Sequence, residues 1–268
     1  MTDAPPWSYL MDLGGALLHD GGHAVQGADA FLDALRRQGI PYLVLTNKSA
    51  QTPRDLRDLM LRAGLDVPEQ AIWTSALATA QFLDAQRPNG TANVIGEAGL
   101  TAALHEVGYV LTDHDPDYVV LGETRTYSFA AITTAIRLIE RGTRFLATNP
   151  DERTPAAEGT MPSTGAVAAL ITRATGRAPY FVGKPNPLML RSALRALGAH
   201  SAGTVLIGDR MDTDVRCGLE SGLQTILVLS GISGEDTASQ FAYRPTRVIR
   251  SVAELADRVT NPFDTGGA

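Results

Sequence analysis

Carboxylates cluster at the ends of two apolar stretches that the sequence predicts to be strands. Asp12 closes the first stretch, and two glycines, Gly14 and Gly15, follow it. Far downstream, the stretch 204–207 leads into Gly208 and Asp209, with further aspartates at 212 and 214. The carboxyl ends of parallel strands form the edge at which open α/β sheets bind ligands. We therefore expect these acidic side chains to share one pocket.

The acidic residue types suit a hard divalent cation. Mg²⁺ prefers oxygen ligands, and it usually takes only one or two protein carboxylates because it keeps several of its waters. We predict that Asp209 is a direct ligand, and that Asp214 acts through water or braces a lysine. Asp212 has two interpretations, a residue of the metal site or an acid favoured by the dipole of the following helix.

Asp12 has a second chemical use. A carboxylate at a strand end, beside glycines that let a ligand approach the backbone, can attack phosphorus and form an aspartyl-phosphate. Taken alone, Asp12 is more typical of an ordinary turn. Its interpretation as a nucleophile therefore depends on the other motifs.

Two further motifs offer contacts for phosphate. The apolar run 43–45 ends in Thr46 and Asn47, whose hydroxyl and backbone N–H can hold phosphate oxygens, although Thr and Asn are also common in turns. The other motif contains Lys184, which with Lys48 makes up all the lysine of a chain with 23 basic residues. Because arginine is used nearly everywhere else, we predict that position 184 needs a compact ammonium group. A surface lysine in a loop is the alternative.

Strand-like and helix-like segments alternate along the chain, which predicts an α/β fold with a doubly wound parallel sheet. Apolar residues at 28, 31, 32 and 35 have helical spacing. Thr52-Pro53 and Asn186-Pro187 are typical helix starts. The strands predicted for the core are 9–12, 42–46, 204–208, 225–229 and 247–249.

The middle of the chain carries its own set of elements. The predicted strands there are 93–95, 118–121 and 144–147, and the predicted helices lie near 100–107, 129–140 and 166–175. We therefore expect a core built from residues 1–80 and 183–268, with residues 81–182 forming an inserted α/β domain.

The composition narrows the classes of partner. The 268 residues carry a net charge of −6, and no basic run suggests a nucleic acid polymer as partner. No apolar run is long enough to span a bilayer, and the first residues lack the pattern of a signal peptide. Cys217 is the single cysteine, so an internal disulfide is excluded. We expect a cytoplasmic protein without a membrane partner, and its oligomeric state is open.

In this order, the motifs around Asp12, Thr46-Asn47, Lys184 and Asp209 with Asp214 resemble those of the haloacid dehalogenase superfamily. The large insert before the lysine is similar to the cap of the NagD-like phosphatases. The resemblance covers nearly the whole chain and includes the segments 74–76, 122–125 and 147–151.

The resemblance implies a Mg²⁺-dependent phosphatase with a cap domain, acting on small phosphorylated metabolites such as nucleotide or sugar phosphates. It implies that Asp12 is the nucleophile, and that Thr46, Asn47 and Lys184 bind phosphate. The metal would be held by Asp12, Asp209 and the main-chain carbonyl of Gly14, with Asp214 close by. The cap residues that it suggests for substrate contact are Glu123, Thr148 and Asn149.

Gly14 departs from the family pattern, which has a second aspartate at this position. That aspartate protonates the leaving oxygen and later activates the hydrolytic water, and loss of a general acid–base typically costs about 10²- to 10⁴-fold in rate. We expect the first half-reaction to survive with good leaving groups, while the second stalls at the phospho-enzyme. Candidates for a substitute proton donor are His19, Asp20, His23 and Lys48, for which loop polarity is the alternative.

Three functions stay open on the sequence. The first is a slow or unusual phosphatase, the second a non-catalytic phosphate-binding or regulatory protein, and the third phosphoryl transfer to an acceptor other than water. The retained carboxylates and Lys184 favour the first and third, whereas Gly14 favours the second and third. We predict a phosphatase, because most of the catalytic roles are filled.

Overall fold

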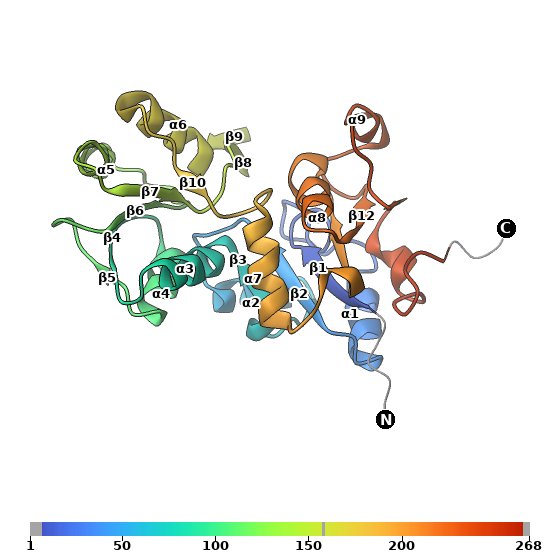
Figure 1. The fold of residues 1–268 in the computed structure, drawn as a ribbon. Coiled ribbons are helices and arrows are strands. Elements are labelled where there is room, and N and C mark those ends of the chain that lie inside the picture. Colours follow the sequence, from blue (N-terminus) through green and yellow to red (C-terminus); the bar gives the residue numbers. More distant parts are fainter. Residues whose placement is uncertain (1–6, 157–158, 265–268) are drawn as a thin grey trace. The chain divides into compact units, whose positions relative to one another are not determined.

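The computed structural model describes residues 7–156 and 159–264, which form two compact units (Figure 1). Among the described residues, the first unit contains 7–46, 55–73 and 190–264, and the second contains 47–54, 74–156 and 159–189. The boundaries expected for the inserted domain, at 81 and 182, remain a prediction.

A six-stranded sheet with the order β13-β12-β11-β1-β2-β3 organises the first unit. The pairs from β13 to β2 are all parallel, and the strand order reverses direction between β1 and β11, as in a doubly wound fold. The strands are β1 (Ser8–Asp12), β2 (Tyr42–Thr46), β3 (Ile72–Thr74), β11 (Thr204–Gly208), β12 (Gln224–Val228) and β13 (Arg247–Ile249).

The helices around this sheet follow the sequence pattern closely. In α1 the buried residues include Phe31, Leu32 and Leu35, the apolar face expected from their spacing. Helices α2 and α7 both begin with proline, whose missing N–H is tolerated in a first turn. The helices that adjoin the strands of this sheet are α1 (Ala28–Arg37), α2 (Pro53–Arg62), α7 (Pro187–Leu197), α8 (Arg216–Glu220) and α9 (Glu235–Ser239).

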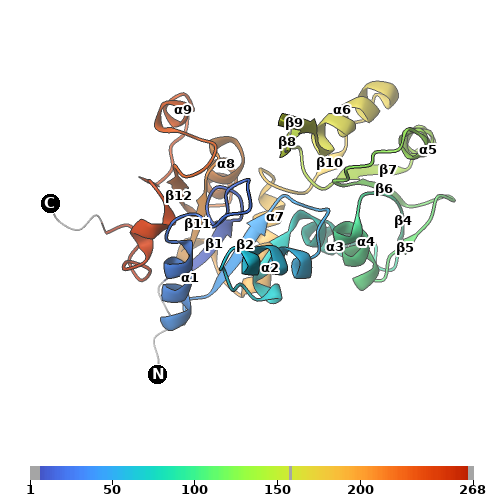
Figure 2. The same ribbon diagram turned by 180° about the vertical axis from the view of Figure 1, so that it is seen from behind.

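The second unit has a parallel sheet of its own, with the order β10-β7-β6-β4-β5. Helices α3 and α4 lie on one face of it and α5 and α6 on the other (Figures 1 and 2). Its helices are α3 (Ser75–Gln86), α4 (Ala98–Glu106), α5 (Phe129–Glu140) and α6 (Thr164–Thr175). Its strands are β4 (Thr91–Ile95), β5 (Val110–Leu111), β6 (Tyr118–Leu121), β7 (Arg144–Ala147) and β10 (Tyr180–Phe181), besides an antiparallel hairpin of β8 (Arg153–Ala156) and β9 (Gly159–Pro162).

The predicted α/β class with a parallel core sheet is confirmed. The strands that sequence reasoning missed are β3, β5, β10 and the β8–β9 hairpin, and the missed helices include α3 and α9. Three of these strands have only two or three residues, too few for a periodic pattern to show. Within the described part of the chain, no helix is both long enough and apolar enough to cross a bilayer.

Candidate active site

The register of the first sheet brings two acidic strand ends side by side. Met11 of β1 pairs with Ile207 of β11, so Asp12 lies next to Gly208 and Asp209 follows one residue later. On the other side of β1, Asp12 pairs with Leu45 of β2, one residue before Thr46. The parallel pairing therefore gathers the carboxyl ends of β11, β1 and β2 at one edge, as the sequence predicted.

Three carboxylates converge at this edge. Asp12, Asp209 and Asp214 each place one oxygen within 4.8 Å of the others, and they are the one such group among the described residues. Asp209 and Asp214 are 3 % and 1 % exposed. Buried carboxylates at this spacing repel one another unless a cation or proton lies between them. An all-oxygen donor set fits Mg²⁺.

Asp209 is held by a segment to which the sequence analysis assigned no role in the site. The Ile232 N–H donates to Asp209 Oδ2 at 2.7 Å, and the Ser230 hydroxyl donates to the Gly15 carbonyl at 2.6 Å. A Cβ atom at Gly231 or at Gly15 would overlap the Asp209 side chain. The sequence signal was available, because Ser230 and Gly231 closely follow β12, the neighbour of β11 in the sheet.

Asp214 reaches the cluster through a wide helical turn. Residues Met211–Val215 form a π-turn in which Val215 N–H donates to the Arg210 carbonyl, five residues earlier. Such turns are frequent at functional sites. The turn places the Asp214 side chain against Gly208, where a Cβ atom would overlap it. The Arg210 N–H donates to Asp214 Oδ2 at 3.1 Å. The turn thus brings carboxylate oxygens of Asp209 and Asp214, five residues apart in the sequence, within 4.8 Å of each other.

Asp212 lies outside the carboxylate group. Its two oxygens accept hydrogen bonds from the Arg210 guanidinium at 3.0 and 2.8 Å. Partial burial raises the pKa of Asp212, but the Arg210 contacts outweigh this and leave the pKa below its ordinary value. These contacts with Arg210 speak against the first of the two interpretations of Asp212, a residue of the metal site.

Gly14 lies next to Asp12 and has space around it. A Cβ atom at this position would meet Asp12 Oδ2 at 3.7 Å, an ordinary van der Waals contact, and Gly14 is not among the glycines with positive φ. Its carbonyl accepts the Ala16 N–H at 2.7 Å. Since a carbonyl oxygen has two lone pairs, one of them remains available for a metal ion.

The residues expected to bind phosphate fall in both units. Thr46, 4 % exposed, is the last residue of β2 in the first unit. Asn47 and Lys184 belong to the second unit, where the side-chain amide of Asn47 is hydrogen-bonded to the main chain of Lys184. Lys184 is 3 % exposed, so the surface-loop interpretation is wrong for it. Its role toward phosphate remains a prediction.

The cap residues expected at the substrate make internal contacts in the second unit. Thr148 Oγ1 donates to Ser49 Oγ at 3.0 Å, and Asn149 Nδ2 donates to the Asn47 carbonyl at 2.8 Å. Glu123 Oε2 accepts the Ser49 N–H at 3.0 Å. Burial raises the pKa of Glu123, and the Ser49 hydrogen bond only partly opposes this rise. Contact of these three residues with substrate remains a prediction.

The four substitute proton donors are surface residues. His19, Asp20, His23 and Lys48 are all exposed. His19 and His23 face each other across a turn in which the His19 N–H donates to the His23 carbonyl at 2.9 Å. This arrangement favours the interpretation of the loop as ordinary surface polarity.

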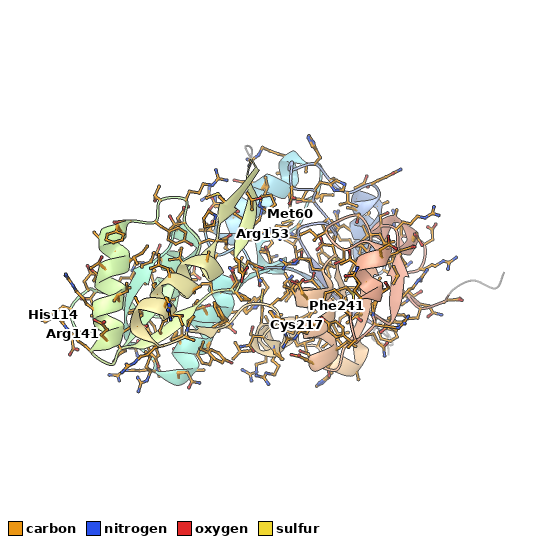
Figure 3. All side chains as sticks on the ribbon, turned by 90° about the horizontal axis from the view of Figure 1, so that it is seen from above. Met60, His114, Arg141, Arg153, Cys217 and Phe241 are labelled. Atoms are coloured by element: carbon orange, nitrogen blue, oxygen red, sulfur yellow. The ribbon has the colours of Figure 1, made fainter. Side chains whose placement is uncertain are left out.

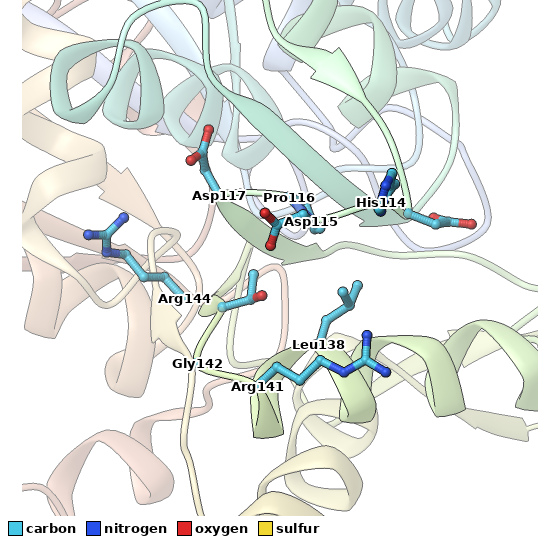
Figure 4. Close-up of a pocket in the computed structure, with 10 residues that line it drawn as sticks. His114, Asp115, Pro116, Asp117, Leu138, Arg141, Gly142 and Arg144 are labelled. Carbon is cyan, nitrogen blue, oxygen red and sulfur yellow. The ribbon is translucent and has the colours of Figure 1, made fainter.

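A separate cavity of about 520 Å³ lies in the second unit, where β6 and β7 begin (Figure 4). Its charged lining residues are Asp113, His114, Asp115, Asp117, Arg141 and Arg144. Figure 3 shows His114 and Arg141 at one end of the unit. Among the described residues, no carboxylates here converge as the three aspartates of the first unit do.

Comparison with known proteins agrees with this geometry. Residues 9–110 match the family model of haloacid dehalogenase-like hydrolases, and residues 181–255 match a HAD-hydrolase-like model. The chain is 57 % identical to a dihydroxyacetone phosphatase of Corynebacterium glutamicum, over 97 % of this chain and 94 % of that protein. It is 42 % identical to the ribonucleotide monophosphatase NagD of Escherichia coli, over 92 % of this chain and 96 % of that one. The solved structure of NagD from Escherichia coli superposes with a TM-score of 0.88, covering 92 % of this chain and 97 % of that one.

The chain therefore belongs to the haloacid dehalogenase-like hydrolases, and within them to the NagD-like phosphatases. The family expected from the motifs is confirmed, and so is the assignment to the phosphatases.

Proposed function

We propose that this protein is a Mg²⁺-dependent phosphomonoesterase that acts through an aspartyl-phosphate on Asp12. The observation that carries the proposal is the convergence of Asp12, Asp209 and Asp214 within 4.8 Å beside Gly14. Bound Mg²⁺ would supply positive charge against the carboxylates and the phosphate oxygens. A carboxylate of Asp12 forms the new P–O bond, the bond from phosphorus to the leaving oxygen breaks, and water then hydrolyses the acyl phosphate.

Gly14 gives this chemistry a leaving-group dependence. The structure provides no side chain at position 14 to protonate the departing oxygen. Because an unprotonated alkoxide leaves more slowly the more basic it is, we expect esters with less basic leaving groups to be preferred. The second step also lacks the carboxylate that would activate water, so phospho-enzyme is expected to accumulate.

We further propose a small keto-sugar phosphate of the dihydroxyacetone phosphate type as the substrate. Support comes from the relative that is 57 % identical and is named a dihydroxyacetone phosphatase. It also comes from chemistry, since the carbonyl beside the ester carbon withdraws electrons and makes the leaving oxygen less basic than that of a simple alcohol. A nucleoside 5′-monophosphate, suggested by the NagD relative, has no such carbonyl.

Phosphate release with Mg²⁺ tests the proposal. We expect release from dihydroxyacetone phosphate to exceed release from a ribonucleoside 5′-monophosphate, and we expect none with Asp12→Asn. Binding of the phosphates without release would instead favour a regulatory phosphate-binding protein. Formation of phospho-aspartate that is discharged by an added alcohol, but not by water, would favour transfer to another acceptor.

A further inference from the structure

The side-chain amide of Asn47 contacts the main chain on both sides of Lys184. The Lys184 N–H donates to Asn47 Oδ1 at 2.9 Å, and Asn47 Nδ2 donates to the Lys184 carbonyl at 3.0 Å. These bonds join residues that are 137 positions apart in the chain, within one unit. A contact with both flanking peptide groups fixes the position and direction of the Lys184 backbone relative to Asn47.

The remaining donor of the amide is also used. Asn47 Nδ2 donates to Asp151 Oδ2 at 2.9 Å. A primary amide has two N–H donors, so none is left for the oxygen of a phosphate. The amide orientation is determined by its partners, because a flipped amide would point its oxygen at the Lys184 carbonyl and the Asp151 carboxylate.

Asn47 is itself held rigidly. Its main-chain carbonyl accepts hydrogen bonds from Ser75 Oγ at 2.6 Å and from Asn149 Nδ2 at 2.8 Å. The approach to Lys184 also depends on Gly183, where a Cβ atom would lie only 2.7 Å from Asn47 Oδ1. The residues around Asn47 and the glycine before Lys184 therefore both favour this contact.

We propose that Asn47 is a positioning residue for Lys184 and that its side chain is not a phosphate ligand. This inference rests on the proposed function and on the expectation that Lys184 binds the phosphate of the substrate. It limits the expected phosphate contact of Asn47 to its backbone N–H, as the sequence analysis expected. Because the lysine stem is flexible, a fixed backbone narrows the range of positions that its ammonium group can reach.

Calorimetric titration with inorganic phosphate in the presence of Mg²⁺ tests the inference without turnover. Asn47→Ala should weaken phosphate binding by roughly 10- to 100-fold, because a displaced Lys184 would lose its hydrogen bond to the charged phosphate. Lys184→Ala should weaken it at least as much. The double variant should bind no more weakly than Lys184→Ala alone, because Asn47 acts only through the lysine.

Asn93→Ala is the matched control. Asn93 is a buried asparagine of the same unit, and its Nδ2 donates to Asp113 Oδ1 at 2.7 Å in a part of the sheet that carries no proposed site residue. Its loss should leave phosphate affinity unchanged in both the parent and the Lys184→Ala background. Thermal unfolding of every variant separates affinity from stability. Asn47→Ser, whose single hydroxyl cannot contact both sides of Lys184, replaces Asn47→Ala if the latter does not fold.

Two outcomes overturn the inference while leaving the proposed function intact. In the first, the parent protein binds phosphate and hydrolyses phosphate esters, and the Asn47 variant binds phosphate with the same affinity. The other is a double variant whose losses add, since that would show an effect of Asn47 independent of Lys184. A parent that neither binds inorganic phosphate nor releases it from esters overturns both proposals together.

Discussion

Replacing Gly14 by aspartate is the sharpest test of how this site works. The structure has room for the change, because a Cβ atom would lie 3.7 Å from Asp12 Oδ2 and the backbone is not in the left-handed region. Replacing a glycine under such conditions usually stabilises a fold by about 0.4–1 kcal/mol, through a less flexible unfolded chain. We therefore expect Gly14→Asp to fold, so that its effect on rate can be measured directly.

The expected effect is a gain in turnover. A positioned general acid–base contributes about 10²- to 10⁴-fold, so a recovery of roughly 10²-fold corresponds to about 2.7 kcal/mol of barrier. The neighbouring carboxylate of Asp12 should raise the pKa of the new carboxyl and favour the protonated form that can donate to the leaving oxygen. The gain should be largest for alkyl phosphates and smaller for p-nitrophenyl phosphate, whose leaving group needs no proton.

The assay compares kcat on one alkyl and one aryl phosphate for three proteins. Gly14→Asn is the matched control, because its side chain has nearly the same size and cannot deliver a carboxylic proton. We expect the gain with aspartate and none with asparagine. Equal rates of parent and Gly14→Asp on both substrates would refute the missing-acid account. A parent that is already fast on alkyl esters would point to a substitute donor.

Four further outcomes are expected. Asp12→Asn should abolish both turnover and the trapping of phospho-aspartate, and residual turnover equal to the parent would exclude Asp12 as nucleophile. Asp209→Asn should weaken Mg²⁺ binding in calorimetry, whereas unchanged affinity would count against the metal site. Gly231→Ala should displace Asp209, which it would overlap, with a loss of about 1–3 kcal/mol in unfolding free energy and weaker Mg²⁺ binding; a variant with parental stability and affinity would show that Asp209 needs no such space. Burial raises the pKa of Glu123, so its contribution to stability is complete below the ordinary pKa of glutamate and is lost as pH rises through the folded pKa. Glu123→Gln should remove that loss in thermal unfolding followed from about pH 4 to about pH 8, and an unchanged pH profile would contradict it.

The sequence predicted the strand ends well because the polar residues of the site come at the end of each apolar run. The run at 204–208 is fully buried in β11, and the first acidic residue after it is Asp209. The same holds for β1 and Asp12, which the parallel register then brings beside β11. Local pattern and sheet topology are sufficient for this part of the site.

The contacts that hold those residues could not be predicted in the same way. The hydrogen bonds between Asn47 and Lys184 span 137 positions, and no local pattern indicates which lysine an asparagine will contact. The packing of Gly231 and Ile232 around Asp209 likewise depends on the neighbouring strand of the folded sheet. Glycine and asparagine are also common in ordinary turns. Their presence at positions 47 and 231 therefore did not indicate that they hold Lys184 and Asp209 in place.

The glycines around the carboxylates differ in whether the packing requires a glycine. At Gly15, Gly208 and Gly231 a Cβ atom would overlap an aspartate of the group, so the packing itself demands glycine there. At Gly14 the nearest atom to such a Cβ is 3.7 Å away, and the backbone suits any residue. No steric reason in the structure accounts for glycine at position 14. We therefore expect the absence of a carboxylate at position 14 to affect the reaction and not the folding, and a single substitution there to change the rate while leaving the fold intact.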